Sequence, residues 1–275
     1  MHAPTPEQRA ATRVRPARSP VMFQSWSHLL FLHWRWDAAA IQATLPEGLF
    51  VDTFNNDAYL GIVPFWMDAV RPRFCPPVPG RLSWFLELNL RTYVHTADGT
   101  PGVWFYSLDC NNPVAVVLAR TFFSLPYVHA RQTGSRPKPF CHLISDKPPA
   151  ASAFTEFTST RRSALRSASP THSAAQPTSR FRYAGTTPPA PAQPGTLEYF
   201  LAERYLLFSQ SRRTGQLFSG RVWHHPYRLS PARLDHAETS LFTDNAFPHP
   251  ERPADHAMVS PCVDVSIFGL EPLAL

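Results

Sequence analysis

A row of polar side chains within an apolar strand is the first feature that could support chemistry. Because side chains alternate along a strand, the run that ends at Val94 places Glu87, Asn89, Arg91 and Tyr93 on one face and leucines on the other. One interpretation is a solvent-exposed face with a Glu/Arg charge pair. The other is an enclosed interior, where Glu87 performs acid-base work and Arg91 holds an anionic ligand.

The surrounding sequence favours the enclosed interior. The row lies between the aromatic pair at 84–85 and the aromatic run at 104–106, in the most apolar region of the chain. Burial would raise the pKa of Glu87, and the positive charge of Arg91 would lower it. A carboxylate under these opposed effects is suited to acid-base chemistry or to holding a ligand.

Two further side chains are candidates for the same site. Tyr127 and His129 are two residues apart on a predicted strand, so they would share a face and could form an acid-base pair. The alternative for His129 is a hydrogen-bonded core histidine. His224 and His225 are adjacent and would point to opposite faces of a strand, so we expect no metal site there, and no cofactor motif is present.

The elements that would position these residues are mostly strands. The segment Phe23–Trp36 is typical of a strand buried on both faces, and 85–94 and 103–108 form a strand pair across an Asp-Gly turn. Asn112 followed by Pro113 predicts a helix start. Thr196 is expected to cap a helix over 197–208.

The ends and middle of the chain have a different composition. Residues 1–20 are Pro-interrupted and Arg-rich without apolar periodicity, which predicts a disordered basic arm. Residues 21–270 are expected to form a single domain. This domain would contain a Pro/Ser-rich, poorly ordered segment near 132–195, with short strands at 154–162 and 180–183.

Charge and composition restrict the partners. The net charge is +6, with +3 in residues 1–20 and +7 in 131–195, so the well-patterned remainder carries −4. An ordered basic face is therefore not expected, and we predict no nucleic-acid partner. No apolar stretch is long enough to cross a bilayer, and the four cysteines are too scattered to suggest a zinc site or a disulfide framework. We expect a cytoplasmic protein without a membrane partner.

Several motifs carry a resemblance to a known family. They comprise Leu30–Trp34, Leu45–Leu49, Gly61–Phe65, Glu87–Val94, Gly102–Phe105 and Leu197–Tyr205, in this order along the chain. The sequence resembles the uncharacterised bacterial YqjF-like family, which is grouped with the acetoacetate decarboxylase-like superfamily. The resemblance covers about residues 22–267. It implies an α+β, predominantly antiparallel fold: a closed, cone-like β-barrel with a few short helices and an internal cavity.

The resemblance does not extend to the catalytic lysine of true acetoacetate decarboxylases. Their lysine forms a Schiff base within an aromatic-Pro-Lys-like turn, and Tyr127 occupies the corresponding position here, after Pro126. Only Lys138 and Lys147 are lysines, and both lie beside prolines in the weakly patterned segment. A Schiff base requires a desolvated amine, so we expect none. Glu87 matches a strand glutamate that the superfamily tends to keep in its cavity.

Three functions remain open from the sequence. The first is a cavity that binds a small anionic keto- or hydroxy-acid-like molecule through Asn89, Arg91, Tyr93, Tyr127 and His129. The second is a lyase or hydro-lyase that uses Glu87 as acid/base. The third is a non-catalytic interaction protein whose cavity is closed by side chains. A homo-oligomer is compatible with all three.

Overall fold

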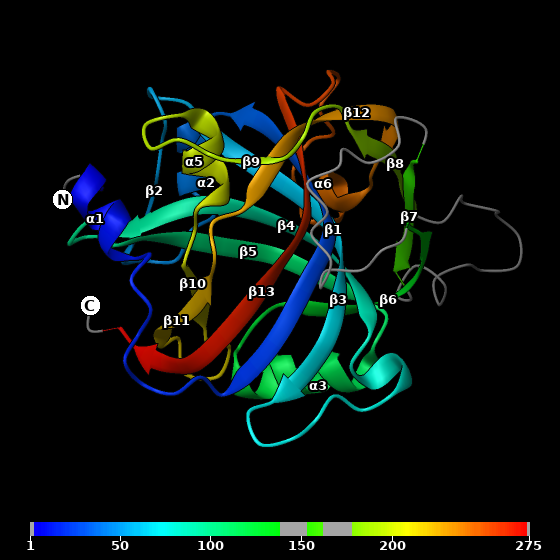
Figure 1. The fold of residues 1–275 in the computed structure, drawn as a ribbon. Helices are drawn as coiled ribbons and strands as arrows, with labels where there is room; N and C mark the ends of the chain where they lie inside the picture. The colour runs from blue at the N-terminus through cyan, green and yellow to red at the C-terminus, as the bar shows by residue number, and fades with distance from the viewer. Residues whose placement is uncertain (1–2, 138–152, 162–177, 274–275) are drawn as a thin grey trace, which may run out of the picture.

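The computed structural model describes residues 3–137, 153–161 and 178–273, and strands dominate them (Figure 1). The strands are β1 Met22–Trp36, β2 Leu49–Val51, β3 Ala58–Pro72, β4 Phe85–Thr96, β5 Pro101–Cys110, β6 Tyr127–Ser135, β7 Thr155–Arg161, β8 Thr178–Gly185, β9 Ala190–Pro191, β10 Leu206–Gln210, β11 Leu217–His224, β12 Arg228–Glu238 and β13 His256–Pro272. The helices are α1 Pro6–Ala11, α2 Ala38–Gln42, α3 Pro113–Phe122, α5 Leu197–Ala202 and α6 Leu241–Asp244, with a 3₁₀ turn at Gly80–Leu82.

The strand pairings form a continuous circuit. The order β4-β3-β1-β13-β11-β10-β5 returns to its start because β4 also pairs with β5. These pairings are antiparallel except β10–β5, and β5 also pairs in parallel with β6. From β6 the sheet continues through β7 and β8 to β12, which pairs back onto β13.

Two apolar cores lie on opposite faces of the same strands. On β1, Leu29 and Phe31 belong to one core, whereas Leu30 and Leu32 belong to the other. The prediction of a strand buried on both faces is therefore confirmed. The first core lies inside the circuit of strands, and the second lies between its outer face and β7, β8 and α6. Burial on both faces leaves β4 no solvated side for its polar residues.

Local signals for helix starts are confirmed, but one helix ends earlier than predicted. The Asn112 side chain accepts hydrogen bonds from the backbone at the start of α3, and Thr196 caps α5 in the same way. The helix predicted over 197–208 stops at Ala202, because Leu206–Gln210 forms β10 between β11 and β5. Non-local strand pairing outweighs the helical spacing there.

The Pro/Ser-rich segment contributes strands to the sheet. The short strands predicted at 154–162 and 180–183 appear as β7 and β8. The predicted poorly ordered stretches fall largely on 138–152 and 162–177, which lie outside the described residues.

The N-terminal residues differ from the predicted disordered arm. Residues 6–11 form α1, which has a capping box at Thr5. Arg9 donates two hydrogen bonds of 2.7 Å to the buried Asp52 carboxylate. Arg9, Arg13, Arg15 and Arg18 each lie over an aromatic ring of the domain. These contacts need no apolar periodicity, which explains why the sequence pattern did not predict them.

The described cysteines differ in their bonding state. Cys75 and Cys110 are free, whereas Cys262 is disulfide-bonded, a bond that the scattered spacing of the cysteines did not suggest. None of the described helices combines the length and the apolar character that crossing a membrane requires.

The ion pair between Arg9 of α1 and Asp52 should stabilise the fold. Arg9→Met should destabilise the protein by about 1–2 kcal/mol, because the buried Asp52 keeps Arg204 as a partner but loses two charged hydrogen bonds. The exposed Arg213 offers a control, and Arg213→Met should change the free energy of unfolding by less than about 0.5 kcal/mol. Urea unfolding of both variants provides the measurement. Equal midpoints for Arg9→Met and wild type would contradict the docking.

Candidate functional site

The polar row of β4 points into the circuit of strands. Glu87, Asn89 and Arg91 have the same parity as Phe85 and Tyr93, which belong to the inner core. All three polar side chains line a cavity of about 310 Å³. Glu87 is 3% exposed and Arg91 is 8% exposed, so neither lies on a solvated surface.

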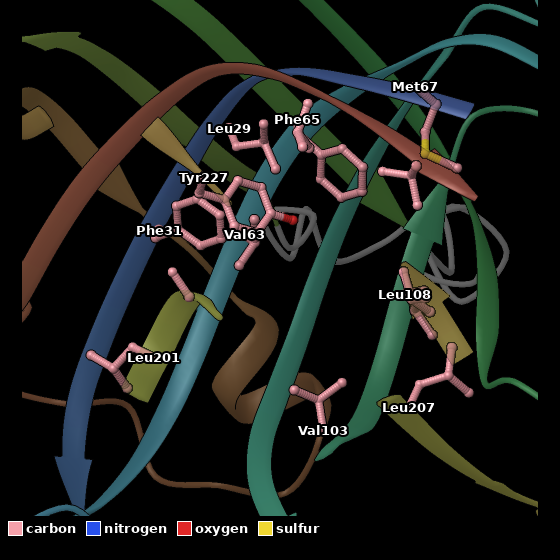
Figure 2. Close-up of a cluster of buried hydrophobic side chains, with 14 of the residues drawn as sticks. Leu29, Phe31, Val63, Phe65, Met67, Val103, Leu108, Leu201, Leu207 and Tyr227 are labelled. Atoms are coloured by element: carbon pink, nitrogen blue, oxygen red, sulfur yellow. The ribbon is translucent and has the colours of Figure 1, made fainter. Parts of the chain in front are cut away.

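The cavity walls are largely apolar. Figure 2 shows side chains from β1, β3 and β5 converging on one interior. The wall includes Leu29, Phe31, Val63, Phe65, Met67, Val103, Leu108, Leu207 and Tyr227. At one end, the lining includes residues of the loop between β3 and β4 and of α3 that are about half exposed.

Glu87 and Tyr127 form the first polar pair of the cavity. The parallel pairing of β5 with β6 sets Tyr127 opposite Leu108, one strand away from Glu87. The Tyr127 hydroxyl donates a 2.5 Å hydrogen bond to Glu87 Oε2. Burial raises the pKa of Glu87 from its ordinary value of 4.5 to about 7, against the lowering effect of the hydrogen bonds from Tyr127 and Asn89. Burial also raises the pKa of Tyr127, which keeps its hydroxyl a donor.

Asn89 extends this pair with an unused acceptor. Its Nδ2 donates to Glu87 Oε1 at 3.4 Å. Its buried Oδ1 has no hydrogen-bond partner among the described residues. Since a buried amide oxygen normally accepts a hydrogen bond, this atom is suited to a ligand hydroxyl or a water.

Arg91 is the second polar centre, and no carboxylate among the described residues pairs with its positive charge. Its Nη2 donates long hydrogen bonds to the Tyr93 hydroxyl at 3.4 Å and to the Leu201 carbonyl at 3.3 Å. The guanidinium lies over the rings of Phe31 and Tyr93. Its buried Nε–H has no partner, and no ion pair joins Arg91 to a carboxylate in the described part of the chain.

Glu87 and Arg91 do not neutralise each other. They are four positions apart along the strand, which corresponds to about 13 Å between their backbones. Arg91 Nη2 donates to the Tyr93 hydroxyl, on the side away from Glu87. The Glu87 carboxylate accepts from Tyr127 and Asn89, so no hydrogen bond joins it to Arg91. The expectation that Arg91 lowers the pKa of Glu87 is therefore wrong, and burial dominates.

Tyr93 and His129, which the sequence suggested as ligand-binding residues, are not among the described residues that line the cavity. Tyr93 is fully buried, and its hydroxyl is 2.7 Å from His33 Nε2. His129 pairs with Cys110 at the end of β5, and β6 pairs with β7 from Ala130 onward. A shared face on a strand therefore does not by itself place both Tyr127 and His129 in the cavity lining.

Arg204 and Tyr227 line the cavity and were missed by the sequence reasoning. Arg204 Nη1 contacts Asp52 at 2.7 Å, whereas its buried Nη2 has no partner among the described atoms. Tyr227 packs edge-on against Phe31. No local pattern distinguishes these two residues from core residues, because only the tertiary pairing of β10, β11 and β12 brings them to β4.

Comparison with known proteins agrees with this architecture. Residues 23–264 match the family model DUF2071, described as an uncharacterized conserved protein. The chain is 35% identical over 215 residues to the uncharacterized protein YqjF of Bacillus subtilis strain 168, covering 78% of this chain and 77% of that protein.

Solved structures with similar folds are acetoacetate decarboxylase-like. One is an acetoacetate decarboxylase-like enzyme from Sphingomonas wittichii RW1, with a TM-score of 0.61 and 14% identity over 94% of each chain. Another is the enduracididine biosynthesis enzyme MppR complexed with pyruvate, with a TM-score of 0.62 and 14% identity over 94% of this chain and 92% of that one. The mostly stranded architecture is thus of the acetoacetate decarboxylase-like type, and by its sequence the chain belongs to the DUF2071 family together with YqjF.

Proposed function

We propose that the chain binds a small anionic molecule resembling a keto or hydroxy acid, inside a closed cone-like barrel formed by the circuit of strands. The observation that carries this proposal is Arg91, a buried cation that lines the cavity with an unpartnered Nε–H and no carboxylate counterion among the described residues. A buried charge without a partner is costly. A ligand carboxylate would offset that cost with a charged hydrogen bond.

The remaining polar atoms fit the same class of ligand. Asn89 Oδ1 can accept from a ligand hydroxyl, and Arg204 Nη2 supplies a second free donor. Pyruvate, the ligand of one structural neighbour, is a small keto acid of this kind. In a non-catalytic interaction protein, side chains were expected to close the cavity. The open volume of about 310 Å³ weighs against that alternative.

Binding would proceed without Schiff-base chemistry. Tyr127 occupies the lysine-like position and donates its hydroxyl to Glu87. Its phenol oxygen cannot form an imine with a carbonyl ligand. Lys138 and Lys147 lie outside the described residues.

A lyase or hydro-lyase is the second candidate, and the environment of Glu87 favours it. A buried carboxyl with a pKa of about 7 is divided between its acid and base forms near neutral pH. As a base, it could accept a proton from a carbon next to a ligand carbonyl. As an acid, it could return that proton to a departing hydroxyl, which leaves as water.

The binding proposal predicts a specific effect at Arg91. Arg91→Met should weaken binding of pyruvate, acetoacetate or 3-hydroxybutyrate by about 10- to 100-fold, because a buried charged hydrogen bond is lost. The variant should be at least as stable as wild type, since an uncompensated buried charge is replaced by an apolar side chain. Isothermal titration calorimetry measures the affinity, and Arg213→Met is the matched loss of an exposed arginine. Unchanged affinity in Arg91→Met would exclude Arg91 as the anion site.

The absence of imine chemistry can be tested by trapping. Incubation with acetoacetate or pyruvate and borohydride should leave the intact mass of the protein unchanged, because Tyr127 stands at the lysine-like position. Intact-protein mass spectrometry is the measurement. A reduced adduct mapped to Lys138 or Lys147 would restore decarboxylase-type chemistry.

Glu87 should give the protein a characteristic pH dependence. Its folded-state pKa of about 7 lies above the ordinary 4.5, so the folded state holds a proton that the unfolded state releases between these values. The stability of wild type relative to Glu87→Gln should therefore fall by roughly 3 kcal/mol between pH 4 and pH 8. Urea unfolding across this range tests it, with Glu47→Gln as the exposed control. Parallel profiles for wild type and Glu87→Gln would refute the buried, pKa-shifted carboxyl.

A further inference from the structure

We infer that the ligand is an amphipathic acid: its carboxylate lies at Arg91 and an apolar body extends past Glu87 to an opening between α3 and the loop over residues 73–84. This inference rests on the proposed function and specifies its substrate class. It is carried by the composition of the walls, the size of the cavity and the character of its opening.

The wall between the two ends offers an apolar molecule a continuous surface. Six of the side chains that line this path are Leu29, Val63, Phe65, Met67, Phe85 and Leu108. All six belong to the inner core, and each is at most 4% exposed. Apolar surface of this kind is poorly suited to water and gains free energy when an apolar group covers it.

The cavity is larger than a three-carbon acid requires. A volume of about 310 Å³ lies near the lower bound, about 300 Å³, of cavities that bury drug-sized ligands. It corresponds to roughly ten water volumes. Pyruvate, with six non-hydrogen atoms, would leave part of this apolar space unfilled, so a ligand with about ten or more non-hydrogen atoms fits better.

The opening is apolar as well. Val78 and Leu82 of the loop and Val114 and Leu118 of α3 line the cavity, and each is between 46% and 50% exposed. The loop and α3 are held together by Asn112, whose Nδ2 donates to the carbonyls of residues 81 and 82. Figure 1 shows α3 beside this loop at one end of the sheet. None of the described lining residues at this opening is charged, so an apolar chain can enter without displacing a charged side chain.

The direction of β4 orders the polar groups along the path. β4 begins directly after the loop, and Glu87 pairs with Cys110, which ends β5 just before α3. Glu87 therefore lies toward the opening, Arg91 lies deeper, and Asn89 lies between them. A carboxylate at Arg91 places Glu87 beside the body of the ligand, about 13 Å further along the strand. A hydroxyl or carbonyl on that body would meet Asn89 and Glu87.

The test measures affinity against chain length. Linear 2-oxo acids of three, eight and twelve carbons share one head group, and calorimetry on the full chain gives their dissociation constants. Affinity should rise by about fourfold for each methylene that is buried in the apolar site. Leu118→Asn should weaken the twelve-carbon acid, which is long enough to pass Glu87, at least threefold and leave pyruvate within twofold. Val117→Asn is the matched control, because Val117 is exposed on α3 but does not line the cavity, and it should change neither.

The outcomes separate this inference from the proposed function. If pyruvate binds and the longer acids bind no more tightly, the amphipathic ligand is refuted while anion binding at Arg91 stands. If none of the three acids binds wild type, the proposed function itself fails. If the twelve-carbon acid binds tightly but is as insensitive to Leu118→Asn as to Val117→Asn, the path to the α3 opening is wrong.

Discussion

The burial of β4 on both faces is the constraint on which the site depends. Leu88 and Leu90 occupy the outer core, so the alternate residues must face the interior of the circuit. The strand therefore brings a carboxyl, an amide and a guanidinium into an apolar space. Each must find a partner there, in a neighbouring side chain, a water or a ligand, or remain unsatisfied.

The partners that these groups find divide the interior into two polar centres. At the end near α3, Glu87 is satisfied by Tyr127 and Asn89, and burial holds it partly protonated near neutral pH. At the deep end, Arg91 receives weak backbone and hydroxyl contacts and no countercharge from the described residues. An anion at the deep end and an acid-base group along its body are the chemical functions that this arrangement supports.

The deep end is connected to the surface of the protein. The Tyr93 hydroxyl contacts His33, and His33 Nδ1 lies 2.9 Å from His256 Nδ1. Burial lowers the pKa of both histidines, so they are neutral near pH 7 and relay a hydrogen bond without adding charge. On another side, Asp52 joins Arg204 of the cavity to Arg9 of α1. The N-terminal segment thus shares an ion-pair network with the lining.

Period-two alternation predicted the essential feature of the site. Glu87, Asn89 and Arg91 share a face, and they lie where that face was expected to point if the strand were enclosed. Tyr127 lines the cavity, whereas His129, two residues further along β6, is not in the lining. Capping residues predicted the starts of α3 and α5 but not the end of α5. Local preferences set such starts, whereas tertiary pairing decides where elements stop.

The remaining features depend on contacts between distant parts of the chain. Arg204 and Tyr227 reach the cavity through pairings of β10 to β12 that no local spacing encodes. The basic N-terminal segment was predicted to be disordered because it lacks apolar periodicity. Its arginines instead pack over aromatic rings, a contact that leaves no periodic pattern in the sequence. The separation of Glu87 from Arg91 follows from strand geometry, but only the three-dimensional structure shows that no carboxylate among the described residues neutralises Arg91.

A crystal structure of the full chain grown with 2-oxododecanoate tests the central claim most directly. We expect the ligand carboxylate within hydrogen-bonding distance of Arg91 Nε, with the carbon chain passing Glu87 toward Leu118. A carboxylate bound elsewhere, or a cavity that excludes the acid while Arg91 pairs with a carboxylate of the chain itself, would contradict it.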